Sequence, residues 1–132
     1  MKILFAEGEK DLNRVISNRL IENGHSVESC FDGEATIAHI AESNYDAIIL
    51  DYTLPKKDGF EVLDTVRKSG VSTPILFMTS RGAEEICVRS LDYGANDCIK
   101  KPFFFNEMMQ KLSAIMMDSY DRYRIHAEGR EE

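Results

Sequence analysis

Hydrophobic residues in this chain form short continuous runs, separated by segments in which they recur at helical spacing. The clearest runs cover 2–6, 47–50 and 75–78. Apolar runs of this length, bounded by turn residues, are typical of strands buried on both faces of a parallel sheet. A more polar run at 26–31 suits a strand nearer the sheet edge, and 97–100 predicts a brief fifth strand.

Five helices are predicted between and after these strands. Their apolar positions are Leu12, Val15, Ile16 and Leu20; Ala35, Ile37, Ala38 and Ile40; Phe60, Leu63 and Val66; Ala83, Ile86, Cys87 and Leu91; and Met108, Met109, Leu112, Ile115 and Met116. Asp32 is a candidate N-cap for the second helix, and Gly94 is a stop signal for the fourth. Strands alternating with helices predict one α/β domain, a parallel sheet covered on both faces.

The charge balance narrows the classes of partner. The 132 residues carry 16 Lys and Arg against 23 Asp and Glu, a net charge of −7. A net acidic domain is poorly suited to gripping nucleic acid phosphates, so we expect protein partners or cations and no direct nucleic acid contact. The sequence contains no apolar stretch of membrane-spanning length and starts without a signal-peptide pattern, which predicts a soluble, cytoplasmic protein with no membrane contact.

The cysteines are odd in number and widely separated. They are Cys30, Cys87 and Cys98, with no C-x-x-C pair among them. This pattern predicts reduced thiols, and it argues against a disulfide framework or a zinc site.

Polar residues follow four of the predicted strands. Glu7, Asp51, Thr79 and Lys101 each come at or just after the end of an apolar run. Taken alone, each has an ordinary explanation; Asp51, for example, suits a strand-capping residue about as well as a functional one. In a parallel sheet, however, these strand ends meet at one edge, where ligands bind in open α/β folds. Their joint occurrence favours a functional site.

Four blocks of the sequence, in order, resemble the receiver domain of bacterial two-component response regulators. They are MKILFAEGE, YDAIILDYTLPKKDGFEVL, TPILFMTS and GANDCIKKPF. The resemblance implies a flavodoxin-like, doubly wound sheet of five parallel strands in the order 2-1-3-4-5, with five helices. It covers residues 1–118. Residues 119–132 then form a helix extension or a frayed tail, a candidate start of a linker to an output domain.

The resemblance also implies roles for individual residues. Asp51 would accept a phosphoryl group from a phosphohistidine on a sensor histidine kinase or phosphotransfer protein. Thr79 would hydrogen-bond a phosphoryl oxygen, and Lys101 would pair with another by charge. Lys100 is the competing lysine, but the family's lysine directly precedes a proline in a cis peptide, which favours Lys101. Such a domain is not an enzyme beyond catalysing its own phosphorylation and dephosphorylation.

A Mg²⁺ ion is the cofactor that the resemblance implies. Its ligands would be Glu7, Asp51 and the backbone carbonyl of Thr53, with several retained waters. The family has two adjacent acids after the first strand, whereas this chain has Gly8 in the second position. We therefore expect weakened Mg²⁺ binding, unless Glu9 compensates by bending inward.

Two further departures concern the switch and the last helix. The family's switching aromatic, three positions before the lysine, is replaced here by Cys98, and Tyr93 is a weak candidate to replace it. Any signal would then travel through the loop after Thr79 and the face formed by the fourth helix, fifth strand and fifth helix. The aromatic run 103–105 is predicted to place at least one ring in the core and one or two on a partner-facing patch.

Other functional interpretations of the sequence compete with a phosphorylated receiver domain. A pseudo-receiver, acting as an interaction module without phosphorylation, is favoured by Gly8 and Cys98 but opposed by the retained Asp51, Thr79 and Lys101. A haloacid dehalogenase-type phosphatase would need an aspartate where Thr53 stands, and no glycine-rich dinucleotide loop follows the first strand. A C-terminal DNA-binding output domain and a homodimer are further expectations of the resemblance.

Overall fold

The computed structural model describes the backbone of residues 1–80 and 82–131, and the side chains of these residues other than 83 and 121–131. Five strands and five helices alternate along it. The strands are β1 (Lys2–Ala6), β2 (Ser26–Cys30), β3 (Ala47–Asp51), β4 (Ile75–Thr79) and β5 (Asp97–Lys100). The helices are α1 (Lys10–Glu22), α2 (Gly33–Glu42), α3 (Gly59–Lys68), α4 (Ala83–Asp92) and α5 (Phe105–Glu131).

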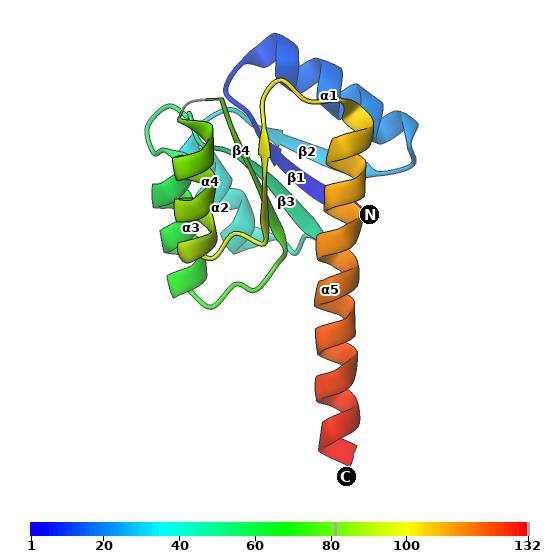
Figure 1. Cartoon of the computed structure of the whole chain (residues 1–132). Helices are drawn as coiled ribbons and strands as arrows, with labels where there is room; N and C mark the ends of the chain where they lie inside the picture. The colour runs from blue at the N-terminus through cyan, green and yellow to red at the C-terminus, as the bar shows by residue number, and fades with distance from the viewer. Residues whose placement is uncertain (81, 132) are drawn as a thin grey trace.

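The strands form one parallel sheet in the order β2-β1-β3-β4-β5. Helices α1 and α5 cover one face, while α2, α3 and α4 cover the other (Figure 1). The predicted doubly wound α/β fold and its strand order are confirmed. β3 and β4 are buried along their whole length, as their apolar runs predict, and the more polar β2 lies at the sheet edge.

Two core clusters lie on the two faces of the sheet. On the α2–α4 side, Leu63 and Val66 of α3 pack with Phe77 of β4. On the other side, Met108 and Leu112 of α5 pack with the alternate residues of β1, β3 and β4. The predicted apolar faces of α3 and α5 are therefore confirmed.

Acidic side chains cap the N-termini of α1, α2 and α3, and Glu9 is the cap of α1. The Asp32 side chain accepts a hydrogen bond from the Ala35 amide at the start of α2, and Asp58 does the same for Glu61 in α3. Helix α4 differs, because its N-cap is Gly82 in a left-handed conformation (φ 43°), which supplies no side-chain acceptor. Its first turn therefore lacks the cap that α2 and α3 have.

Helix α5 extends beyond the lower end of the sheet (Figure 1). The predicted continuation past residue 118 is thus helical as far as Glu131, whereas Glu132 and the side chain of Tyr123 lie outside the described residues. Within the described part of the chain, no helix combines the length and apolar character needed to cross a bilayer.

Candidate functional site

Four strand ends bring their polar residues to one edge of the sheet, as the sequence predicts. Asp51 is the last residue of β3, and Thr79 is the last residue of the neighbouring β4. Glu7 follows β1 directly, and Lys101 follows β5. Glu7, Asp51 and Thr79 are at most 4% exposed, so these groups lie in a protein environment and not in bulk water.

Lys101 joins the two acids. Its Nζ lies 3.0 Å from Asp51 Oδ2 and also donates a hydrogen bond to Glu7 Oε1. The backbone amide of Lys101 donates to the Thr79 carbonyl at 2.9 Å, and the Lys101–Pro102 peptide is cis, as expected. Lys100 is exposed and pairs with Thr79 in the sheet register, so Lys101 is the lysine that reaches the acids.

The charges in this cluster do not balance. Two carboxylates face one ammonium group in a largely buried environment. Burial, together with the nearby Glu7 charge, raises the pKa of Asp51 to about 6, although Lys101 acts in the opposite direction. Burial alone would lower the pKa of the Lys101 ammonium, but its contacts with Glu7 and Asp51 outweigh that effect and raise it. The site therefore favours a ligand or group that supplies positive charge.

The cluster opens into a cleft of about 450 Å³ at the surface. Its walls are formed by Glu7, Gly8, Glu9, Asp51, Thr53, Pro55, Ser80 and Lys101. The predicted site residues Glu7, Asp51, Thr53 and Lys101 thus share one cavity. Thr79 lies behind it as a fully buried residue at the end of the adjacent strand.

Glu9 borders the cleft, but its carboxylate is engaged by helix α1. Its two carboxylate oxygens accept hydrogen bonds from the Asp11 and Leu12 amides, at 3.0 and 2.8 Å, and so cap α1. The Glu9 amide itself donates to Glu7 Oε2 at 2.9 Å. The alternative in which Glu9 replaces the missing second acid is therefore not the arrangement seen in the structure.

The remaining oxygen donors suit a hard cation such as Mg²⁺. Glu7 and Asp51 supply carboxylates, and the Thr53 carbonyl lies 3.8 Å from where a Cβ on Gly8 would stand. Mg²⁺ is commonly held by one or two carboxylates with several waters retained, so this donor set fits the ion with few protein ligands. Among the described residues, no cluster of three or more His, Cys, Asp or Glu has the spacing of a metal site. The cleft therefore offers few protein oxygen ligands for a metal ion.

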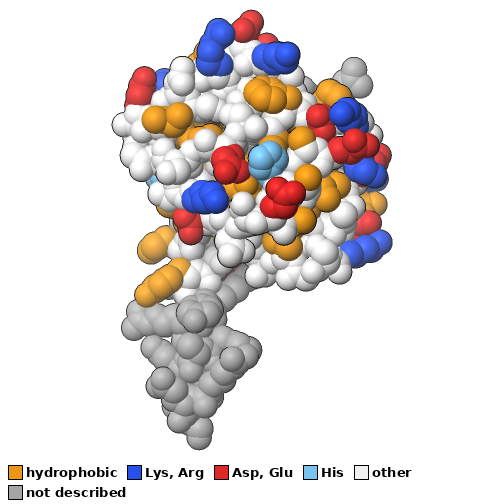
Figure 2. Space-filling view, turned by 180° about the vertical axis from the view of Figure 1, so that it is seen from behind, with side chains coloured by type: hydrophobic (Ala, Val, Ile, Leu, Met, Phe, Trp, Pro, Cys, Tyr) orange, Lys and Arg blue, Asp and Glu red, His pale blue; other side chains and the backbone are white. Residues whose placement is uncertain are grey.

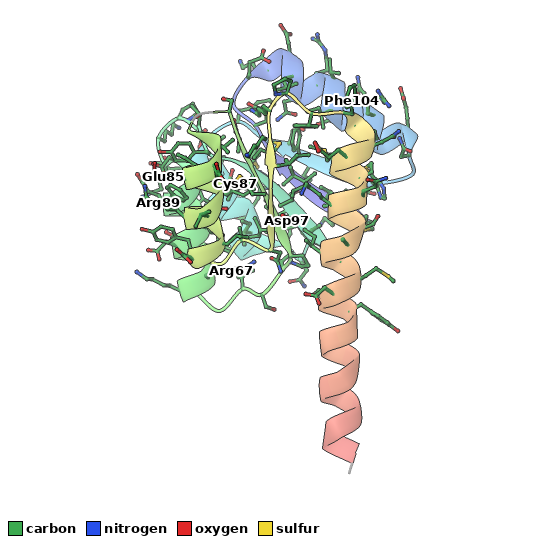
Figure 3. The ribbon with its side chains drawn as sticks, viewed as in Figure 1. Arg67, Glu85, Cys87, Arg89, Asp97 and Phe104 are labelled. Atoms are coloured by element: carbon green, nitrogen blue, oxygen red, sulfur yellow. A yellow bond between two sulfur atoms is a disulfide. The ribbon has the colours of Figure 1, made fainter. Side chains whose placement is uncertain are left out.

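A second, apolar groove of about 420 Å³ borders the cleft and shares Ser80 and Lys101 with it. Residues of α1 and of the segment after β5 form its walls: Leu12, Val15, Ile16, Arg19, Pro102, Phe103 and Phe105. Of the three consecutive aromatics, Phe103 and Phe105 pack against the core, while Phe104 is 86% exposed (Figure 3). At least one ring lies in the core and one is exposed, as predicted, while the partner-facing role of the exposed ring stays a prediction; the sequence did not predict the groove.

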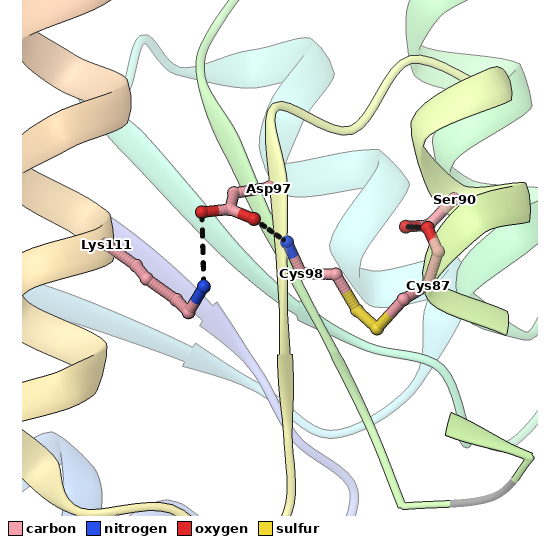
Figure 4. Close-up of a disulfide and its surroundings, with 5 residues drawn as sticks. All are labelled: Cys87, Ser90, Asp97, Cys98 and Lys111. Carbon is pink, nitrogen blue, oxygen red and sulfur yellow. Dashed lines mark hydrogen bonds and ion pairs between the residues drawn. A yellow bond between two sulfur atoms is a disulfide. The ribbon is translucent and has the colours of Figure 1, made fainter. Parts of the chain in front are cut away.

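The cysteine prediction is wrong for two of the three residues. Cys87 of α4 and Cys98 of β5 form a disulfide with a Cα–Cα distance of 5.5 Å, whereas Cys30 is a buried free thiol (Figure 4). The two cysteines are 11 residues apart in sequence, but the chain turns at Gly94, so that β5 runs back alongside α4. Tyr93 packs beside Phe60, with ring centroids 5.3 Å apart, in agreement with a packing role.

Comparison with known proteins points to one family. The model of the response regulator receiver domain matches residues 3–113. The chain is 38% identical to the transcriptional regulatory protein TcrA of Mycobacterium tuberculosis over 115 residues, which cover 87% of this chain and 46% of TcrA. It is 38% identical to DltR of Streptococcus agalactiae over 112 residues, 85% of this chain and 50% of DltR. The chain thus spans about half the length of these curated relatives.

Solved structures agree with the family match. The receiver domain of the Francisella response regulator 1452 superposes with a TM-score of 0.84 at 28% identity, covering 89% of this chain and 98% of that one. A response regulator from Clostridium difficile gives a TM-score of 0.82 at 28% identity, covering 89% and 96%.

Proposed function

This chain belongs to the response regulator receiver family of two-component systems, and we propose that Asp51 is its phosphoacceptor. One observation carries the proposal. Asp51 ends β3 inside an open cleft, and its carboxylate lies 3.0 Å from the Lys101 ammonium. Its carboxylate therefore lines the cleft beside a cation that can neutralise charge on a newly attached group. Glu7 shares both features, so the choice of Asp51 over Glu7 rests on the family resemblance of the segment that ends β3.

The proposed reaction is a phosphoryl transfer. An Asp51 oxygen attacks the phosphorus of a phosphohistidine, the P–N bond breaks, and the histidine leaves with the electron pair while an acyl phosphate forms. Such transfers depend on positioning and on neutralising charge. Lys101 supplies positive charge to one phosphoryl oxygen, and the Thr79 hydroxyl donates to another. Glu7, Asp51 and the Thr53 carbonyl would hold Mg²⁺, which supplies further neutralisation when bound; with Gly8 in place of an acid, we expect weak binding.

The apolar groove beside the cleft is the surface that we assign to the phosphodonor protein. It shares Lys101 and Ser80 with the cleft, so a partner seated against α1 and Phe103 would hold its phosphohistidine next to Asp51. The partner is a sensor histidine kinase or phosphotransfer protein in the cytoplasm. TcrA and DltR are named transcriptional regulatory proteins, and a DNA-binding output domain and a homodimer belong to the same proposal for this chain.

Labelling with a small phosphodonor tests the assignment. We expect acetyl phosphate with Mg²⁺ to add one phosphoryl group, detected by intact mass after acid quench, and Asp51→Asn to remove it. Because the small donor does not use the groove, Val15→Glu serves as a control and should label normally; Val15 is 55% exposed. No adduct on the wild type, from acetyl phosphate or from a cognate kinase, would favour the pseudo-receiver. An adduct that persists in Asp51→Asn would place the acceptor elsewhere.

A further inference from the structure

Cys87 and Cys98 connect a helix to the sheet at the face opposite the groove. Cys87 lies in the middle of α4, and Cys98 is the second residue of β5 (Figure 4). Both side chains are partly exposed, whereas Cys30 is 2% exposed. Small redox reagents can therefore reach the pair, while Cys30 is shielded. Burial also raises the pKa of the Cys30 thiol to about 11, which keeps it in the unreactive protonated form.

Helix α4 has few other attachments. Among its described side chains only Ser90 is fully buried, and Val88 and Leu91 are 56% and 49% exposed. Ile86 is partly buried against the core, the Arg89 guanidinium lies 4.7 Å from the Phe60 ring centroid, and the N-cap Gly82 provides no side-chain hydrogen bond. Elements with little apolar burial open at low free energy. The disulfide is therefore a major part of what holds α4 against β5.

Strand β5 is tied on both sides by adjacent residues. Cys98 bonds to α4, and the Asp97 carboxylate pairs with Lys111 of α5 at 3.4 Å (Figure 4). Three residues after Cys98, Lys101 reaches the acidic cleft, and its amide is bonded to the Thr79 carbonyl. The chain from Thr79 runs on into α4 within a few residues. Helix α4 is therefore connected to the cleft in two ways: through the loop after Thr79, and through the disulfide and β5 to Lys101.

We propose that Cys87 and Cys98 form a reversible thiol–disulfide switch that sets how firmly α4 is held on the α4–β5–α5 face. In the oxidised form the S–S bond clamps α4 to β5, and in the reduced form α4 is released to open locally. The redox input acts on the same helix that the loop after Thr79 enters, so the two signals converge there. This convergence rests on the proposed phosphorylation of Asp51, but the clamp itself does not.

The chemistry of the switch is ordinary thiol–disulfide exchange. A Cys87 or Cys98 thiolate attacks a small-molecule disulfide, one thiol leaves, and a mixed disulfide forms. The second cysteine thiolate then displaces the other small thiol. In total, two S–H bonds on the protein are lost and one S–S bond forms, and the oxidant takes up the two protons and two electrons as two thiols. A small-molecule thiol reverses both steps.

The test combines thiol counting with hydrogen exchange. The full chain is equilibrated in mixtures of reduced and oxidised glutathione, quenched with acid, and labelled with N-ethylmaleimide under denaturing conditions. We expect three labelled thiols at the reducing end and one, Cys30, at the oxidising end, with peptides containing 87 and 98 linked. Amide exchange in α4 should become about tenfold faster or more on reduction, while α2 remains unchanged.

Three variants make the result decisive. Cys30→Ser should keep the two-thiol titration, and the double variant Cys87→Ala with Cys98→Ala should show fast α4 exchange under all conditions. Asp51→Asn should keep the redox effect on α4, which separates this proposal from the phosphoacceptor assignment. Three reactive thiols at the oxidising end would overturn the switch, and so would equal α4 exchange in the oxidised and reduced forms.

Discussion

Helix α3 and the acidic cleft both bury their side chains, but burial has opposite energetic consequences in the two regions. Helix α3 buries Phe60, Val62, Leu63 and Val66 against the sheet, which removes apolar surface from water and stabilises the fold. The cleft buries Glu7 and Asp51, with Lys101 between them. Burying charge costs free energy unless it is fully compensated, and two acids share one base here. Apolar burial by helix α3 thus stabilises the fold, whereas the buried charges at the strand ends lower the free energy of unfolding.

The largest expected effect comes from removing apolar burial in α3. Leu63 is fully buried, so Leu63→Ala should lower the free energy of unfolding by about 3 kcal/mol, through lost burial and the cavity left behind. Leu91 on α4 is 49% exposed, and Leu91→Ala is the matched control, with an expected loss of about 0.5 kcal/mol or less. Urea denaturation of the oxidised protein measures both. Similar losses in the two variants would show that α4 is packed as firmly as α3.

The next effect has the opposite sign. The folded-state pKa of Asp51, at about 6, is above the ordinary value of 3.8, so the ionised carboxylate opposes folding. Asp51→Asn should therefore stabilise the protein by about 2–3 kcal/mol at pH 7. The gain should shrink as pH falls through 6, because the wild-type carboxyl then takes up a proton in the folded state. It should be mostly lost at pH 4 and vanish only below the ordinary carboxyl pKa of 3.8.

Urea denaturation between pH 4 and pH 8 checks this prediction. Asp92→Asn, at an exposed carboxylate on α4, is the control, because it removes a carboxylate charge that burial does not penalise. A variant less stable than the wild type at pH 7 would mean that the ion pair with Lys101 contributes more than the buried charge costs. The contrast between helix and cleft would then be wrong.

The contrast also explains which features could be predicted from sequence. Continuous apolar runs predicted β3 and β4. The polar residues at four strand ends, Glu7 after β1, Asp51 in β3, Thr79 in β4 and Lys101 after β5, predicted the site, because parallel strands place these ends together. Helical spacing was less informative at the surface. Val15 and Leu91 fit their helical patterns yet are 55% and 49% exposed. Helical periodicity predicts that a helix forms, but it does not predict how much of the apolar face of that helix is buried.

Two features needed three-dimensional information. The Cys87–Cys98 bond forms because the chain turns at Gly94 and places β5 beside α4. A sequence separation of 11 residues does not by itself predict this turn. The role of Glu9 as the α1 cap depends on the loop conformation at Gly8, which the sequence left open. Local chemistry offered a signal for the cap, since an acid directly before a helical pattern is a good acceptor for first-turn amides.

The smallest expected effect comes from adding a third carboxylate to the cleft. A Cβ on Gly8 would lie 3.1 Å from Pro55 Cδ and 3.2 Å from the Phe31 carbonyl oxygen, so any side chain there requires a small local shift. Gly8→Asp and Gly8→Asn are nearly equal in size and share this steric cost, and their difference therefore isolates the charge. Without Mg²⁺, the Asp variant should be less stable than the Asn variant by about 1 kcal/mol, because a further acid joins Glu7 and Asp51.

Mg²⁺ should reverse this order. A third carboxylate adds a ligand and a charge, so Gly8→Asp should bind Mg²⁺ roughly tenfold more tightly than the wild type, and Gly8→Asn should not. Calorimetric titration measures the affinity, and thermal unfolding with and without Mg²⁺ gives an independent readout, because a ligand that binds the folded state stabilises it. Equal Mg²⁺ affinities in the Asp and Asn variants would show that charge at position 8 does not limit Mg²⁺ binding.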